Sequence, residues 1–123
     1  MRRLLGLLLL IAGMFFASCS NSPKEEILKE YEAIIGNSPT IDGSVYNWTS
    51  VSESEVLKAG VILKEKTDKI LGFLPTESEE MKVSAATGDL YTSYIWENSE
   101  IRVNLWIDYK KNTPSIQLVY REK

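Results

Sequence analysis

The stretch that decides the fold of this chain is IRVNLWIDY, residues 101–109. Its odd-numbered residues are all apolar or aromatic, whereas Arg102, Asn104 and Asp108 stand between them. Because successive side chains of a strand point to opposite faces, this alternation predicts a strand that packs one face against a core. Trp106 has the parity of the polar residues, so it is predicted to point away from that core.

Three more strands are predicted around this one, because the apolar period stays near two from Met81 onward. They cover residues 81–86, 90–97 and 116–121, with turns at 87–89, 98–100 and 110–114. Parallel neighbours need a crossover of about a dozen residues or more, so connections this short join antiparallel strands. The C-terminal part is therefore predicted to be a four-stranded antiparallel meander.

A first helix is predicted near the start of the folded body. It begins at the capping box Ser22–Glu25, in which Pro23 takes the first helical position. Apolar side chains then recur at helical spacing from Ile27 to Ile35, and Gly36 is the stop signal.

A second helix is predicted from the capping box Ser52–Glu55, with an apolar face that continues through Leu71 and a stop at Gly72. The pair Val61-Ile62 widens that face, so this helix is predicted to be more deeply buried than the first. Gly60, in the middle of the helix, indicates a bend or a close backbone approach.

Between the helices, residues 37–43 are predicted to be a loop with a turn at Asp42-Gly43, and Val45–Thr49 a short strand. The order is then helix, short strand, helix and four strands. This order predicts an α+β fold, in which two helices pack on one face of an antiparallel sheet. The sheet would consist of the C-terminal meander and the short strand between the helices.

The N-terminal segment has the pattern of a secretory signal peptide. Arg2 and Arg3 precede Leu4–Phe16, an uncharged run of 13 residues, and two small residues then lead to Cys19. About 20 apolar residues are needed to cross a bilayer as a helix, so this run is too short to be a transmembrane anchor.

Phe16-Ala17-Ser18-Cys19 resembles the lipobox of bacterial lipoproteins. The resemblance implies that the signal is cut before Cys19, that the sulfur of Cys19 carries a diacylglycerol and that its new amine carries a fatty acid such as palmitate. The predicted organisation is a cleaved signal peptide at 1–18, the lipidated Cys19 with a short tether at 19–22, and a single α+β domain at 23–123. Cleavage without lipid attachment is the alternative.

Two further features concern the location of the protein. Ser20 follows Cys19 where lipoproteins retained at the inner membrane often carry Asp, which implies the outer membrane. Lys24-Glu25-Glu26 resembles a signal that some lipoproteins use for export to the cell surface. The alternative for that tripeptide is ordinary helix-start chemistry, because the helix dipole favours acidic residues in the first turn. The expected location is the bacterial cell envelope, on the outer membrane, facing either the periplasm or the outside.

The ionisable residues narrow the classes of function. The full chain has 14 basic and 17 acidic residues, and without Arg2 and Arg3 the net charge is about −5. This charge argues against nucleic-acid binding and leaves membrane attachment to the acyl chains. Cys19 is the only cysteine and histidine is absent, which excludes an internal disulfide, His-dependent nucleophiles and imidazole metal ligands. No catalytic residue, metal site or cofactor is predicted.

Carboxylates are the remaining groups with catalytic potential. Glu77, Glu79 and Glu80 are predicted to lie in the loop after the second helix. Paired carboxylates are typical of glycoside hydrolases, and carboxylate clusters are typical of calcium sites. The simpler interpretation is a solvated acidic loop.

Aromatic residues suggest a site for a partner protein. Trp106 and Val119 share the parity that points away from the core. In the strand 90–97, one aromatic pair ends on the outer face whichever way the strand packs. The predicted partner-binding patch consists of Trp106, Tyr94, Trp96 and Val119. Cross-strand packing that stabilises a half-exposed sheet is the alternative.

The favoured function is that of a non-enzymatic, lipid-anchored envelope protein that binds another protein as an accessory or assembly factor. The alternative is an inhibitor or immunity protein that blocks a hydrolase, and a carboxylate-based enzyme is a third hypothesis. In the order of its elements alone, the body resembles outer-membrane assembly lipoproteins and β-lactamase-inhibitor-like domains. That resemblance implies an α+β body but assigns no residue a role.

Overall fold

The computed structural model describes residues 22–49, 51–110 and 112–123. The signal peptide, the lipobox and the lipidation site at Cys19 lie outside the described residues.

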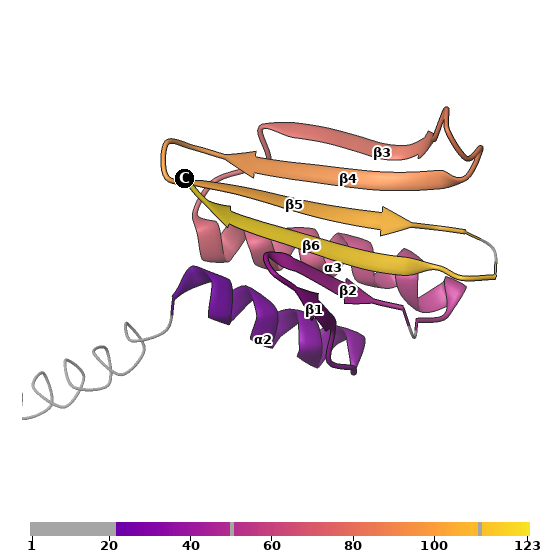
Figure 1. The fold of residues 1–123 in the computed structure, drawn as a ribbon, viewed down its shortest axis with the longest axis horizontal. Helices are drawn as coiled ribbons and strands as arrows, with labels where there is room; N and C mark the ends of the chain where they lie inside the picture. Colours follow the sequence, from indigo (N-terminus) through magenta and orange to yellow (C-terminus); the bar gives the residue numbers. More distant parts are fainter. Residues whose placement is uncertain (1–21, 50, 111) are drawn as a thin grey trace, which may run out of the picture.

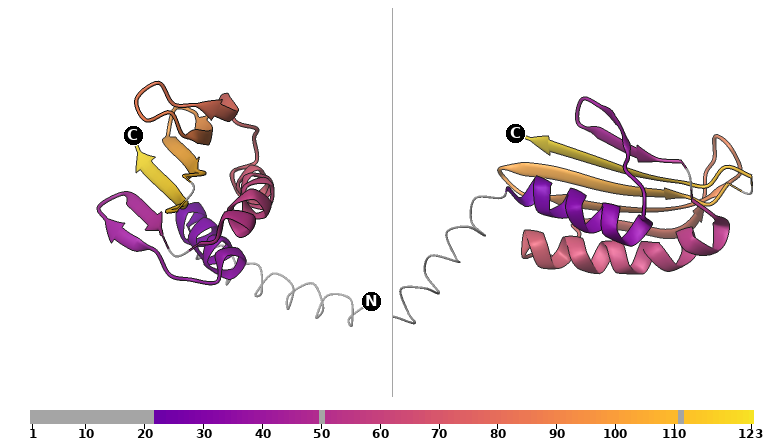
Figure 2. Two further views of the ribbon diagram at one scale, coloured as in Figure 1. Left: turned by 90° about the vertical axis from the view of Figure 1, so that its right-hand side faces the viewer. Right: turned by 90° about the horizontal axis from the view of Figure 1, so that it is seen from below.

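The described chain forms an open, six-stranded antiparallel sheet with two helices on one of its faces (Figures 1 and 2). This arrangement confirms the predicted α+β fold. The elements in chain order are α2 (Pro23–Ile35), β1 (Thr40–Asp42), β2 (Val45–Trp48), α3 (Glu53–Leu71), β3 (Glu77–Val83), β4 (Leu90–Glu97), β5 (Ile101–Asp108) and β6 (Ser115–Glu122). The strand order is β1-β2-β6-β5-β4-β3, so the predicted meander is present and β2 extends it beside β6.

The helices begin where the sequence predicts. The Ser22 hydroxyl accepts a hydrogen bond from the backbone N–H of Glu25 (3.3 Å), which is one half of the predicted capping box. At α3 both halves form, because Ser52 accepts from the backbone of Glu55 (3.2 Å) while the Glu55 carboxylate accepts from the backbone of Ser52 (3.5 Å). Each helix ends at a glycine in the left-handed conformation, which satisfies a terminal carbonyl group.

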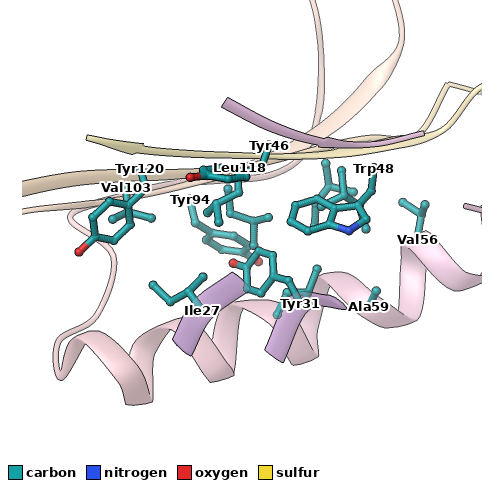
Figure 3. Packing of buried hydrophobic residues seen from close by; sticks show 14 of the residues in the cluster. Ile27, Tyr31, Tyr46, Trp48, Val56, Ala59, Tyr94, Val103, Leu118 and Tyr120 are labelled. Carbon is teal, nitrogen blue, oxygen red and sulfur yellow. The ribbon is translucent and has the colours of Figure 1, made fainter. Parts of the chain in front are cut away.

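The core lies between the helices and the inner face of the sheet. Tyr31 points from α2 toward Trp48 of β2, with 5.7 Å between the ring centroids (Figure 3). Their polar atoms are satisfied, because the Tyr31 hydroxyl bonds to Thr67 Oγ1 (2.6 Å) and the Trp48 indole donates to the carbonyl of Asn37 (2.9 Å). Among the described residues no buried side-chain polar atom lacks a partner, as a close-packed core requires.

One strand is absent from the sequence prediction. The sequence predicts a loop over residues 37–43, whereas Thr40–Asp42 forms β1 and pairs with β2. Gly43, with φ of +61°, makes the tight turn of this hairpin. All three residues of β1 are exposed, so neither face of this strand had to be apolar and its sequence does not show the alternation by which strands are predicted.

The boundaries predicted for the first strand of the meander are wrong. The sequence predicts residues 81–86, whereas β3 spans Glu77–Val83 and all seven of its residues are exposed. Its pairing with β4 shifts between Glu79 and Lys82, and Met81 there has a φ of +51°. This β-bulge changes the parity of the strand, and no helix covers it, so its sequence does not alternate.

The sequence also predicts that Val61 and Ile62 widen the buried apolar face of α3, and this prediction is wrong. Val61 and Ile62 have exposed fractions of 59% and 43%. The helix instead buries the narrower stripe that contains Val56, Ala59, Gly60, Leu63 and Thr67. The close approach predicted at Gly60 is confirmed, because a Cβ atom there would lie 2.8 Å from Cδ1 of Ile107.

Candidate binding face of the sheet

The candidate site is the outer face of the sheet, the face turned away from α2 and α3 (Figure 2). Directly paired residues of antiparallel strands lie on the same face, so the strand register defines its rows. One row across β4, β5, β6 and β2 consists of Ser93, Trp106, Gln117 and Asn47. The next row consists of Ile95, Asn104, Val119 and Val45. These two rows, here called the outer platform, contain no charged side chain, and all of their residues except the buried Ser93 are partly exposed.

An aromatic stack marks one end of the outer platform. The rings of Trp106 and Tyr91 are nearly parallel, with an interplanar angle of 5° and a centroid distance of 4.4 Å. The Tyr91 hydroxyl donates a hydrogen bond to the Glu79 carboxylate of β3, and this bond raises the pKa of Tyr91 above its usual value. The stack therefore holds Trp106 in one orientation and links β5, β4 and β3 on this face.

Amide groups supply hydrogen-bonding capacity to the outer platform. The side-chain amide of Asn104 donates to Ser93 Oγ and to the carbonyl of Tyr94, both at 3.0 Å. Within the described residues the side chains of Asn47 and Gln117 make no hydrogen bond to the protein. They can therefore donate to and accept from a bound partner.

Charged residues lie at the edges of the platform. Glu97, Arg102 and Arg121 form the adjoining row, and Glu97 makes ion pairs with Arg102 (3.5 Å) and Lys123 (2.9 Å). The Lys123 ammonium, which hydrogen-bonds to Glu97, lowers the pKa of that carboxylate. A hollow of about 200 Å³ opens where Arg102 and Arg121 meet Asn104 and Val119.

A second hollow, of about 340 Å³, lies at the β3 side of the same face. It is lined by Glu77, Ser78, Glu79, Ser93 and Ile95. The outer face is thus an uncharged centre with two shallow depressions at its charged margins.

The structure divides the predicted partner-binding patch between the two faces. Trp106 and Val119 lie on the outer face, as predicted from their parity. Tyr94 and Trp96 do not, because they belong to the core with exposed fractions of 6% and 0%. The aromatic residue that β4 contributes to the outer face is Tyr91, which has the opposite parity.

Polar contacts on the inner side explain the burial of these two aromatic residues. The indole N–H of Trp96 donates to Oδ1 of Asp68 on α3 at 2.8 Å. Tyr94 packs beside Trp96 with 5.9 Å between ring centroids, and burial, together with the charge of Glu80, raises the pKa of Tyr94 to about 12. Alternation along β4 correctly separated Tyr94 and Trp96 from Tyr91 and Ile95, but it carries no signal that shows which of the two pairs faces the helices.

The three glutamates predicted to lie in a loop are instead part of β3. Glu77 and Glu79 share the outer face, whereas Glu80 is placed on the other side of the strand near Tyr94. In the part of the chain that the structure describes, no group of three or more acidic or cysteine side chains converges as a metal site would require. The strand therefore separates the Glu80 carboxylate from those of Glu77 and Glu79.

A scan against protein-family models finds no match for this chain, and searches of curated proteins and of solved structures find no significant similarity. None of the described helices is both long enough and apolar enough to span a bilayer.

Proposed function

We propose that this protein is a lipid-anchored, non-enzymatic protein of the bacterial cell envelope and that its outer platform binds a partner protein. The proposal for the anchor rests on the signal-like segment that ends at Cys19 and on its resemblance to a lipobox. The proposed location is the outer membrane, because the residue that follows Cys19 is Ser20.

The arrangement of the outer face is the observation that carries the binding role. Interfaces typically have a centre depleted of charge, enriched in aromatic residues and surrounded by a polar rim. The outer platform has these features, because its two rows are uncharged, the Trp106–Tyr91 stack lies at one end of them, and Arg102, Glu97 and Glu79 lie at the margins. Tryptophan is also the residue type most enriched among those whose truncation weakens binding strongly.

The lipid anchor is tested by a Cys19→Ala variant. Without the sulfur no diacylglycerol can be attached, and stable membrane binding takes more than one acyl chain. We expect wild type to fractionate with membranes and to carry the mass of the lipid, and the variant to be soluble or to remain an uncleaved precursor. Wild type that is soluble and unmodified in mass would contradict the anchor.

The binding face is tested by cross-linking wild type in intact cells, identifying the protein captured and measuring its affinity for the purified domain. Trp106→Ala should weaken that affinity by about 2 kcal/mol or more, about 30-fold in Kd. The matched control is Val61→Ala, which truncates an exposed apolar residue on the helical side of the molecule and should leave the affinity unchanged.

Stability measurements separate loss of binding from loss of folding. Because Trp106 is only partly buried, its truncation should shift the melting temperature modestly. Trp48→Ala removes an indole that is 1% exposed and should instead unfold the domain at a clearly lower temperature. Equal affinity of wild type and Trp106→Ala would reject the outer platform as the binding site, whereas capture of a hydrolase in stoichiometric amount would favour the inhibitor role.

A further inference from the structure

One end of the molecule gathers the start of α2, the end of α3 and the C-terminal residue Lys123 (Figures 1 and 2). It is here called the tether end. Three residues lie between Cys19 and Pro23, the first residue of α2, and the four residue steps from Cys19 to Pro23 span about 14 Å at most in a fully extended chain. A lipid on Cys19 therefore keeps Pro23, at the tether end, within about that distance of the bilayer surface.

The tether end carries an apolar side chain that the fold leaves in water. Leu74 follows α3 and has an exposed fraction of 69%, the highest of the large apolar residues in the described chain. Beside it, Phe73 is partly buried against the core. Phe73 also lines a hollow of about 490 Å³ whose wall includes Pro23, Leu71 and Ile101.

The loop that presents Leu74 is held at both sides. Before it, the backbone N–H of Gly72 donates to the carbonyl of Asp68 (2.9 Å) and closes α3. After it, the backbone and the hydroxyl of Thr76 both donate to the carbonyl of Ile95, at 2.7 and 3.0 Å. The backbone is thus held on both sides of Leu74, so presenting this side chain to an apolar phase would require little ordering of the loop.

The charges around the tether end are of both signs. Glu97 is paired with Lys123 and Arg102, and Lys69 lies in the last turn of α3 while Glu100 lies in the β4–β5 turn. A surface of mixed sign is not drawn to anionic lipid in particular. Its contact with a bilayer should therefore depend on apolar surface and persist on zwitterionic lipid.

We propose that the tether end lies against the bilayer that holds Cys19, with the Leu74 side chain at the boundary between headgroups and acyl chains. This inference rests on the proposed lipidation of Cys19. The strands run along the long axis of the molecule away from this end (Figure 1), so the sheet stands upright on the membrane. The outer platform then faces sideways, toward a partner in or beside the same membrane.

The test uses a single thiol label on the mature lipoprotein. Cys19 is the only cysteine of the chain and its sulfur is blocked by the lipid, so Leu74→Cys introduces one reactive thiol. The labelled protein carries an environment-sensitive fluorophore and is reconstituted into phosphatidylcholine vesicles in which a fraction of the lipids bear a shallow nitroxide quencher. The matched control is Val83→Cys, 65% exposed and located at the end of β3 far from the tether end.

We expect the Leu74→Cys label to shift its emission to shorter wavelength and to lose fluorescence when nitroxide lipid is present. The Val83→Cys label should keep its aqueous spectrum and show no quenching. If the protein floats with the vesicles while the label at position 74 remains aqueous, or if both labels are quenched equally, the upright orientation is wrong and the lipid anchor stands. If wild type lacks the lipid and does not float, the anchor and this orientation fail together.

Discussion

At the scale of single residues, Asp68 connects the helical layer to the sheet. Its Oδ1 accepts from the indole of Trp96 and its Oδ2 from the ammonium of Lys64, each at 2.8 Å. The two contacts differ in kind, because Trp96 is fully buried whereas Lys64 is a partly exposed ion-pair partner one helical turn away.

Asp68→Ala should therefore destabilise the domain more than Lys64→Ala does. The first change leaves the indole N–H of Trp96 without its acceptor, at a cost of about 1–3 kcal/mol. The second removes an ion pair between residues four apart on a helix, worth about 0.3–0.5 kcal/mol. Urea unfolding of the two variants measures both free energies, and equal losses would show that the indole contact contributes nothing.

Two buried tyrosines should make the stability fall at alkaline pH. Burial raises the pKa of Tyr31 above its usual value and the pKa of Tyr94 to about 12. A tyrosine in the unfolded chain ionises near pH 10, so the unfolded state releases protons first. The stability from these two groups is complete below about pH 10 and is lost as the pH rises toward the folded values.

Tyr31→Phe should reduce this pH dependence. The free energy of unfolding, measured in urea between pH 8 and pH 11.5, should fall less steeply above pH 10 in the variant. The difference in slope can reach about 1.4 kcal/mol per pH unit for one tyrosine. Parallel curves for wild type and Tyr31→Phe would mean that the Tyr31 hydroxyl is not protected from ionisation in the folded state.

At the scale of elements, the distance between α3 and the sheet is set where Gly60 faces Ile107 of β5. A Cβ atom at Gly60 would lie 2.8 Å from Cδ1 of Ile107, closer than ordinary contact. Alanine is the better helix former by about 1 kcal/mol, yet overpacking a filled core costs about 1–3 kcal/mol. Ile107 is fully buried, so its end methyl group has little free space in which to move.

A double-mutant cycle separates these two effects. Gly60→Ala alone should be neutral to destabilising, whereas in an Ile107→Val background, which lacks Cδ1, the same change should be stabilising. The coupling free energy should be about 0.5–3 kcal/mol, as is usual for residues in direct contact. Additive effects in chemical denaturation would show that the close approach is relieved by movement of the helix as a whole.

The edge strand β3 shows how an element can lie in the sheet without contributing to the core. All seven of its residues are exposed, and it combines three glutamates, one lysine and a β-bulge. Charged side chains and bulges on an edge strand oppose pairing with another chain. Its carboxylates therefore have a structural explanation on the sheet edge.

At the scale of the whole molecule, stability depends on one core between the sheet and the helices. Leu105 lies at its centre, paired with Tyr94 on one side and Leu118 on the other, and is fully buried. Leu105→Ala should cost about 2–5 kcal/mol through lost apolar burial and the cavity that remains.

The matched control for Leu105 is Val119→Ala, on the neighbouring strand but on the outer face. Because Val119 is only partly buried, we expect a clearly smaller loss of unfolding free energy than for Leu105→Ala. Both values come from urea denaturation followed by far-UV circular dichroism. A loss of about 0.5 kcal/mol or less at Leu105, the range typical of surface sites, would contradict the assignment of the inner face.

Much of this fold could be predicted from short-range patterns. The capping residues and the glycines locate α2 and α3, the turns at 87–89 and 98–100 give the bounds of β4, and strict alternation gives the core face of β5. These signals are local. A cap hydrogen-bonds to the unpaired backbone groups of its own helix turn, and alternation shows which side of a strand contacts apolar residues. The inward position of Leu105 and the outward position of Trp106 follow from the same alternation.

What only the tertiary structure decided is which patterns face the core. Strands β1 and β3 lie at the two edges of the sheet beyond the helices, so no burial selected an alternating sequence there. Along β4 both faces carry aromatic residues, so alternation alone does not show which face is inward. The register with β5 and the contact of Trp96 with Asp68 place Tyr94 and Trp96 on the inner face. Tyr91 is then on the outer face, where it stacks on Trp106. The sequence by itself therefore determined the two helices and the strands that pack on the core, whereas the pairing of strands far apart in the chain determined the edge strands and which residues form the outer platform.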